Sequence, residues 1–430
     1  MRMPLLDRAF YLLDSARSPQ DFTLILDLRE APDVDSFYAG ARSAMNRFPI
    51  SACSVVGRAW VWRENRYFKL AVAEGEDRTA IEKFIDERFD LRREPPVKQL
   101  LMLSESGCTR LATRFHHAAA DGLSAAQWVG HQLNVAYGLE PGQDEPGRFD
   151  GPRLRGSESS VRRSRYAFPG ASDALRTSAS KRPGSRRWTT MCFDARELQR
   201  ACRRAGGFTY HDLLATCTLE VLRIWNDCRG GTPWPPPSFA IRTAGAATEG
   251  RPYNNGYRAQ VSLWVPMNVR QESREGFGNG TSRVRVYANY DRDAPLAEKC
   301  RAVREQVRWT TRHGEWVVPD LPWLTLLPDA IVRPLLRNYL NLPHIDMATA
   351  VFTHAGTSLA SAGDAFKHVE RIECAGLLHQ RQNLAINAAT HSEHTWLTLT
   401  YDPALLTTAD VKQLTQLFSQ QIARARRELS

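Results

Sequence analysis

Two adjacent histidines, His116 and His117, end the alternating segment "TRLATRFHH" and precede three alanines and an Asp121-Gly122 pair. Neighbouring side chains on a strand point to opposite faces, so one imidazole can face a cleft while the other packs beneath it. An imidazole with an unperturbed pKa of about 6.5 is largely neutral at cellular pH and can serve as a general base. The pair indicates acid–base chemistry at one histidine, although it also fits a core histidine that is hydrogen-bonded to the backbone.

The residues that follow the histidines are suited to an open turn. Three small alanines would not obstruct a group that approaches the exposed imidazole. Gly122 permits a backbone conformation or a close approach that a Cβ would forbid. Asp121 stands where the loop enters a helix that is predicted to run from Gly122 to about Tyr137. Its carboxylate can cap that helix or pair with a distant arginine.

Strands and helices that can hold this turn are predicted on both sides of it. The segments 97–106 and 109–117 form an antiparallel hairpin around Ser106-Gly107. The first half also contains a helix over 5–13, a strand over 21–28, a helix over 33–48 capped by Asp33 or Asp35, a strand pair over 52–62 and a helix over 78–89. The second half contains helices over 195–206, 210–225 and 407–429, the last capped by Thr407 or Thr408, and strands over 259–270 and 394–402.

The composition limits the class of protein. With 430 residues, 43% of them hydrophobic, the chain can bury two cores of ordinary size, and its mixed patterns favour an α/β class. The eight cysteines are scattered without a C-x-x-C pair, and the other histidines show no metal-like spacing. Neither a disulfide framework nor a metal site is therefore expected. No signal peptide and no run of about 18 apolar residues is found, which favours a cytoplasmic protein without a membrane span.

A basic segment divides the chain. The net charge is +10, and eleven basic against three acidic residues fall within 148–187, which is rich in Gly, Pro and Ser. We predict an N-terminal lobe over 1–147, a linker or crossover over 148–187 and a C-terminal lobe over 188–430. The segment is either a solvated connection or a patch that attracts an anionic partner. Nucleic acid is not expected as that partner, because the basic residues lack interleaved aromatic side chains.

The pattern H-H-x-x-x-D-G at 116–122 resembles the signature of the thioester-dependent acyltransferase superfamily. This group includes nonribosomal peptide condensation domains, wax ester synthases, polyketide-associated acyltransferases and chloramphenicol acetyltransferase. Further stretches resemble family elements in the same order, namely "NRFPISACSVV", "ERFDLRREPPVKQLLML", "GFTYHDLLATCTLEVLRIW", "LWVPMNVRQ", "GFGNGTS" and "LTLTYDPALLT". The likeness covers nearly the whole chain. It departs at His211, where the family usually has Asn, and retains the neighbouring Asp212.

The resemblance implies a fold and a mechanism. The fold would be an α/β pseudo-dimer, in which two chloramphenicol-acetyltransferase-like lobes form a V around a central tunnel. His117 would be the general base that removes the proton of an amine or hydroxyl as it attacks the thioester carbonyl. Transfer would be direct, without an acyl-enzyme. Asp121 would be structural and would pair across the lobes with Arg270 of "VPMNVR".

Smaller roles are expected for four other residues, and of these the resemblance implies the role of Gly122. Gly122 would keep the turn and expose a backbone N–H to the developing oxyanion. His116 would pack beneath the turn and brace it. Asp212 would be a structural residue of its helix. Asn279 would either hydrogen-bond the substrate or shape the "GNG" turn.

The function implied is that of a stand-alone condensation-type acyltransferase of secondary-metabolite biosynthesis. A monomer would move an acyl group from acyl-CoA or an acyl carrier protein to a small-molecule amine or alcohol, with no permanently bound cofactor. The residues do not choose between ester and amide products, because both acceptors need the same base. They do not choose between the two donors, because both are anionic and the basic segment favours neither. Two alternatives are a catalytically silent relative that binds a carrier protein or other partner, and a nucleic-acid scaffold that rests only on the basic segment.

Overall fold

The computed structural model describes two α/β lobes with one large sheet each, and the first lobe also contains the two-stranded sheet of residues 53–56 and 59–62. The described residues are 1–16, 18–62, 68, 70–75, 77–104, 109–143, 185–228, 261–270, 277–312, 326–341, 348–355, 363–378 and 382–430. The predicted turn at 106–107 lies outside them. So does the predicted basic linker up to residue 184, and its behaviour stays a prediction.

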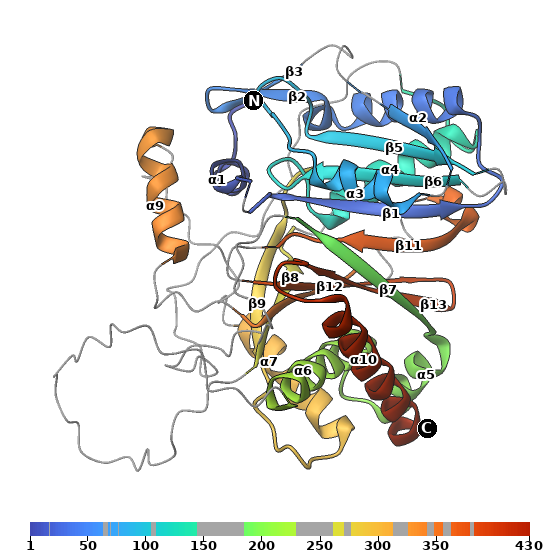
Figure 1. The fold of residues 1–430 in the computed structure, drawn as a ribbon, viewed down its shortest axis with the longest axis vertical. Coiled ribbons are helices and arrows are strands. Elements are labelled where there is room, and N and C mark those ends of the chain that lie inside the picture. The colour runs from blue at the N-terminus through green and yellow to red at the C-terminus, as the bar shows by residue number, and fades with distance from the viewer. Residues whose placement is uncertain are drawn as a thin grey trace.

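A five-stranded sheet forms the centre of the first lobe (Figure 1). Its order is β11-β1-β6-β5-β4, and all its pairs are antiparallel except β4 with β5. Its strands are β1 (Asp21–Leu28), β4 (Leu70–Glu74), β5 (Val97–Leu103), β6 (Thr109–His116) and β11 (Val369–Ala375). The predicted antiparallel pairing of 97–106 with 109–117 is confirmed, because Val97 lies opposite Phe115 and Leu103 opposite Thr109.

Helices cover both faces of this sheet and bury the apolar side chains that β1 carries on both sides. Leu24 of β1 belongs to a core that also contains Phe37 of α2 and Trp128 of α4. Ile25 points to the other face, where it packs with Ile81 of α3. The lobe's further elements are α1 (Leu5–Leu13), α2 (Val34–Arg47), η1 (Pro49–Ala52), β2 (Cys53–Val56), β3 (Ala59–Trp62), α3 (Arg78–Asp86) and α4 (Gly122–Ala136).

A six-stranded sheet forms the second lobe, in the order β7-β13-β12-β10-β8-β9. Its strands are β7 (Arg187–Asp194), β8 (Ser262–Asn268), β9 (Thr281–Tyr287), β10 (Ala350–His354), β12 (Leu384–His391) and β13 (His394–Tyr401). Its helices are α5 (Arg196–Ala205), α6 (Tyr210–Cys228), α7 (Leu296–Arg312) and α10 (Thr408–Leu429). The predicted cap at Thr407 is confirmed, because this residue forms a capping box with Asp410 at the start of α10.

One strand crosses from the second half of the chain into the first sheet. The β11 strand pairs with β1, with Thr23 opposite Ala375, and gives that edge of β1 a hydrogen-bonded neighbour. The predicted boundaries therefore need two adjustments. Residues 369–375 complete the first lobe although they lie within 188–430, and β7 begins at Arg187, inside the predicted linker.

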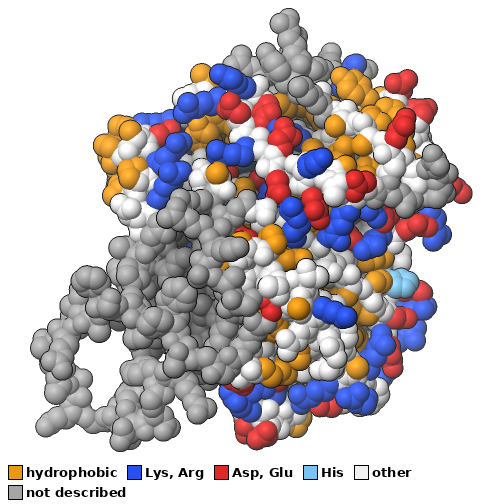
Figure 2. Space-filling view, viewed as in Figure 1, with side chains coloured by type: hydrophobic (Ala, Val, Ile, Leu, Met, Phe, Trp, Pro, Cys, Tyr) orange, Lys and Arg blue, Asp and Glu red, His pale blue; other side chains and the backbone are white. Residues whose placement is uncertain are grey.

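Helix α9 (Asp329–Asn341) lies beside α1 at the edge of the molecule (Figure 1). Arg8 of α1 donates from Nε to a carboxylate oxygen of Asp329 over 2.9 Å. Figure 2 shows apolar side chains over this helix, where Ile331 and Leu335 are exposed, and interspersed charges of both signs elsewhere on the same face. Of the helices that the structure describes, none has the length and apolar character to cross a membrane.

Candidate active site

The motif at 116–122 forms the turn that joins β6 to α4. The β6 strand ends at His116, and the N–H of His117 donates to the carbonyl oxygen of Gln20 over 2.7 Å. Asp121 is the N-cap of α4, as predicted, and accepts the N–H of Ser124 over 3.0 Å. Backbone contacts therefore fix the turn at both ends.

Asp121 also joins the two lobes. Arg270, which follows β8, donates from Nη1 and Nη2 to the two carboxylate oxygens of Asp121 over 2.8 and 2.9 Å. Only 1% of Asp121 and 3% of Arg270 are exposed. Burial alone would raise the pKa of Asp121, but the Arg270 guanidinium outweighs that effect and lowers this pKa. The structure thus contains the pair that the resemblance implied.

The first residue of β9 and the loop before this strand complete the surroundings of Asp121. The N–H of Gly280 and the hydroxyl of Thr281 donate to Asp121 Oδ2 over 2.8 and 2.7 Å. A Cβ at Gly280 would lie 2.5 Å from Cγ of Arg270, so this position requires glycine. Gly122 differs, because its φ is not positive and a Cβ there would meet no described atom within 4 Å. The described backbone and its packing therefore do not require glycine at 122, and the predicted close approach of another group to Gly122 stays a prediction.

The ring of His117 lies against two phenylalanines. It stacks on Phe10 of α1 with the ring centroids 4.5 Å apart, and its centroid is 5.0 Å from that of Phe22 in β1. His117 as a whole residue remains partly exposed. Burial lowers the pKa of His117, and Asp121 and Asn279 offset only part of this effect. The ring is therefore neutral at physiological pH, which is the state that a general base needs.

Asn279 indicates which nitrogen of the His117 ring carries the proton. Its Nδ2 group donates to the backbone oxygen of His117 over 2.6 Å and to Oδ1 of Asp7 over 2.9 Å. Its Oδ1 consequently faces Nδ1 of the ring, 3.4 Å away, and can only accept a hydrogen bond there. The proton is therefore assigned to Nδ1, and the lone pair to Nε2. The structure places Asn279 against the histidine, an arrangement that neither predicted role for Asn279 includes.

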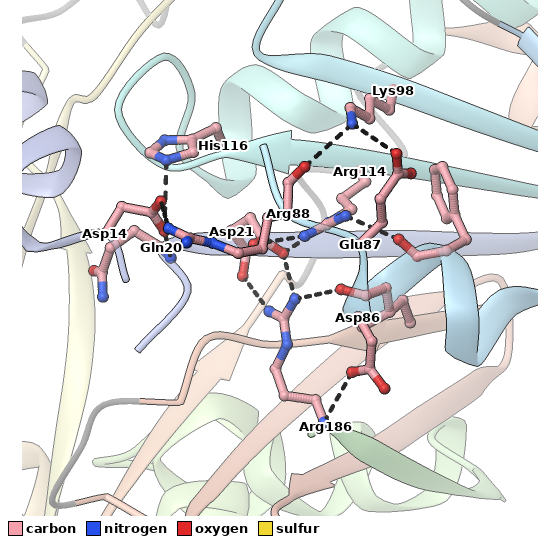
Figure 3. Close-up of polar contacts among 12 residues, drawn as sticks. Asp14, Gln20, Asp21, Asp86, Glu87, Arg88, Lys98, Arg114, His116 and Arg186 are labelled. Atoms are coloured by element: carbon pink, nitrogen blue, oxygen red, sulfur yellow. Dashed lines mark hydrogen bonds and ion pairs between the residues drawn. The ribbon is translucent and has the colours of Figure 1, made fainter. Parts of the chain in front are cut away.

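His116 lies on the other side of the turn (Figure 3). Its Nδ1 accepts the N–H of Ala118 over 3.1 Å, and its Nε2 is 3.9 Å from a carboxylate oxygen of Asp14. The buried ring meets Phe89 edge-on, with the ring centroids 5.6 Å apart. Burial lowers the pKa of His116 to about 4. His116 is therefore a packed, neutral residue beneath the turn, which is the position predicted for it.

A buried cluster of charges beside His116 ties the second lobe to the first (Figure 3). Asp21 of β1 accepts two hydrogen bonds from Arg114 over 2.9 Å and one from Arg186 over 2.6 Å. Burial opposes ionisation of Asp21, but Arg186 and Arg114 together hold its pKa below the usual range. Arg186 belongs to the predicted basic linker, yet it is buried and paired here instead of solvated.

The sequence matches no protein-family model and no curated protein, whereas solved structures match nearly all of the chain. The first condensation domain of the CDA synthetase aligns over 100% of this chain and 97% of its own, with a TM-score of 0.68 and 13% identity. The EpoB cyclization-docking bidomain from Sorangium cellulosum aligns over 100% and 84%, with a TM-score of 0.64 and 15% identity. Polyketide synthase associated protein 5 from Mycobacterium tuberculosis aligns over 99% and 98%, with a TM-score of 0.62 and 12% identity. The chain has the condensation-domain fold.

The condensation-domain fold confirms the predicted α/β pseudo-dimer of two chloramphenicol-acetyltransferase-like lobes. Identities of 12–15% establish the fold alone, so the chemistry of the site has to be argued from its residues. Within this fold the turn at 116–122 comes from the first lobe, and Arg270 and Asn279 come from the second. The candidate site is therefore assembled where the lobes of the condensation-domain fold meet.

Two residues of this site in the condensation-domain fold, Asp7 and Phe10, are not indicated by the sequence patterns. Phe10 stacks on His117, and Asp7 accepts hydrogen bonds from Asn279 and from Nε1 of Trp60, the latter over 3.4 Å. Residues three apart on a helix share a face. The spacing of Asp7 and Phe10, which puts an acidic and an aromatic side chain on one face of α1, is the signal that could have revealed Asp7.

Asp212 and His211 lie in the second lobe of the condensation-domain fold. Asp212 accepts the N–H and the hydroxyl of Thr209 over 2.7 and 2.6 Å, and so closes a cap at the start of α6. His211 lies against His354, with the ring centroids 5.7 Å apart. The structure gives Asp212 a helix-capping position in the second lobe and does not place it in the turn at 116–122. Within the described ranges, no three His, Cys, Asp or Glu side chains are grouped as metal ligands would be.

Proposed function

We propose that this protein transfers an acyl group from a CoA or carrier-protein thioester to an amine or hydroxyl, with His117 as the general base. The observation that carries the proposal is the neutral ring of the partly exposed residue His117 at the junction of the lobes, with Nδ1 held by Asn279. The condensation-domain fold supports it. A variant of the starter condensation domain of rhizomide synthetase, with a TM-score of 0.62 and 11% identity, was solved in complex with C8-CoA and Leu-SNAC.

The proposed reaction needs one base and no covalent intermediate. Nε2 of His117 takes the proton of the acceptor while the acceptor nitrogen or oxygen attacks the thioester carbonyl. A C–N or C–O bond forms and the C–S bond breaks. The imidazolium then returns its proton to the leaving thiolate, so the base ends as it began. A positioned base accounts for about 10²- to 10⁴-fold in rate, and the thioester is already an activated donor.

The other residues of the proposed site hold the base and receive the developing charge. The Asp121–Arg270 pair fixes the turn against the second lobe. Phe10 fixes the plane of the imidazole by stacking. The first turn of α4, which begins at Gly122, would present backbone N–H groups to the oxyanion. One named structural neighbour belongs to a nonribosomal peptide synthetase and another is associated with a polyketide synthase, which supports natural-product assembly as the setting.

Release of free thiol tests this proposal. The purified protein is incubated with acyl-CoAs of increasing chain length and with acylated carrier proteins, each with a panel of amines and alcohols. We expect thiol release that requires both donor and acceptor, and mass spectrometry of the product then distinguishes an ester from an amide. A folded protein that releases no thiol with any pair would favour a silent relative that only binds a partner.

The lowered pKa of His117 sets the expected pH dependence. Protonation removes the base, so kcat/KM should stay constant as the pH falls from about 8 and should decrease only below about 6.5, the ordinary pKa of histidine. The profile should be measured with an alcohol acceptor, because an amine acceptor titrates itself. If kcat/KM instead rises with pH around a midpoint above about 6.5, with substrates that do not titrate, the assignment of a neutral His117 ring would be contradicted.

A further inference from the structure

A buried carboxylate, Asp7, lies behind the proposed base. Its side chain on α1 is 3% exposed. Oδ1 accepts from Nδ2 of Asn279 over 2.9 Å, and Oδ2 is 3.4 Å from Nε1 of Trp60. The amide of Asn279 therefore has an acceptor for each of its two N–H bonds, the backbone oxygen of His117 and the carboxylate of Asp7.

These two acceptors decide which way the Asn279 amide faces. If the amide turned over, its oxygen would lie against two acceptor oxygens, and the ring of His117 would face an NH₂ group. That orientation would favour the opposite tautomer of the ring, with the proton on Nε2. The backbone oxygen of His117 supplies one acceptor whatever residue is at position 7. The second acceptor depends on Asp7.

We propose that Asp7 is a positioning residue of acyl transfer, which acts through Asn279 to keep the proton of neutral His117 on Nδ1 and the lone pair on Nε2. This inference rests on the proposed base role of His117. The carboxyl group lies at a buried place that disfavours its charge. Burial raises the pKa of Asp7 to about 7, and the charge of Asp121 adds to this effect. Both protonation states keep an acceptor oxygen for Asn279, so the role requires no titration of Asp7.

Two substitutions separate the acceptor from the shape of the side chain. Asp7→Leu keeps the branched shape and removes both acceptors. Its kcat should fall about 10-fold, with KM changed less than about 2-fold, because the fraction of ring in the active tautomer falls. Asp7→Asn keeps one amide oxygen that can face Asn279, so it should retain most of the kcat. Asp410→Leu is the matched control, because it removes a buried capping carboxylate from α10 in the other lobe.

The tautomer of His117 gives a readout that a bracing role of Asp7 would not change. Full-length protein labelled with ¹⁵N-histidine should show a His117 ring with the proton on Nδ1, assigned by the signals that His117→Ala removes. In Asp7→Leu the same signals should shift toward a mixture of tautomers. They should be unchanged in Asp7→Asn and in Asp410→Leu, whatever these substitutions do to the melting temperature.

A double-mutant cycle tests whether Asp7 acts through Asn279. The double variant Asp7→Leu/Asn279→Ala should be no slower than Asn279→Ala alone, because removal of the amide also removes the effect of Asp7. Additive losses, or an unchanged His117 tautomer in folded Asp7→Leu, would overturn the inference and leave the proposed function intact. If no donor and acceptor pair turns over, the proposed function fails, and the ring spectra alone decide whether Asp7 sets the tautomer.

Discussion

Replacement of His117 by alanine is expected to lower kcat by about 10²- to 10⁴-fold. The variant loses the only group that the proposal assigns to remove the proton of the acceptor. KM for the thioester should change little, because the base contributes to the transition state more than to binding of the donor. The loss is measured by thiol release at saturating donor and acceptor.

Two controls make this result specific. His394→Ala removes an exposed imidazole at the start of β13 and should retain wild-type turnover. His116→Ala removes the packed neighbour that accepts the N–H of Ala118. It should lower the melting temperature, and its kcat should fall much less than that of His117→Ala. A folded His117→Ala that turns over within about 2-fold of wild type would remove His117 from the mechanism, since a positioned base contributes far more than that.

Replacement of Arg270 by methionine is expected to lower the free energy of unfolding by about 3–5 kcal/mol. The variant would leave Asp121 buried without its countercharge, and it would release the turn at 116–122 from the second lobe. Turnover should fall with it. Arg270→Lys should recover only part of the stability, because lysine cannot bind both carboxylate oxygens in a fork. Urea denaturation of the variants measures the change.

An exposed ion pair provides the matched comparison. Arg292 and Asp227 form a salt bridge in which 53% and 50% of the side chains are exposed, so Arg292→Met should lower the free energy of unfolding by less than about 1 kcal/mol. Equal losses in Arg270→Met and Arg292→Met would contradict the role given to the buried pair.

The stability that Asp121 contributes should depend on pH with a definite sign. The folded pKa of Asp121 is lowered, so its contribution to stability is present above about pH 4 and is lost as the pH falls further.

Local sequence signals predicted the elements around the site because those signals act over a few residues. Alternation identified β5 and β6, and Asp33 caps α2 by accepting the N–H of Ser36, one of the two caps expected. The H-H-x-x-x-D-G spacing placed both histidines at a strand end and Asp121 at a helix start. Such features depend on backbone geometry within one or two turns.

These local signals could not predict contacts between segments that are far apart in the sequence. Arg270 was linked to Asp121, 149 residues away, only by the resemblance to a family. No strand was predicted over 369–375, where apolar and polar residues do not alternate regularly, so the pairing of β11 with β1 was missed. Arg186 belongs to a run of basic residues whose composition indicates solvent, whereas the pairing with Asp21 that buries it depends on how the lobes pack.

A structure with a non-hydrolysable thioester analogue and an acceptor bound together would show whether His117 is the base of acyl transfer. We expect the analogue's carbonyl carbon and the acceptor atom to meet beside His117, with the acceptor about 2.6–3.2 Å from Nε2. We also expect the proton of the ring to remain on Nδ1 against Asn279. An analogue that binds away from the junction of the lobes, with Nε2 of His117 enclosed by protein atoms, would contradict this role.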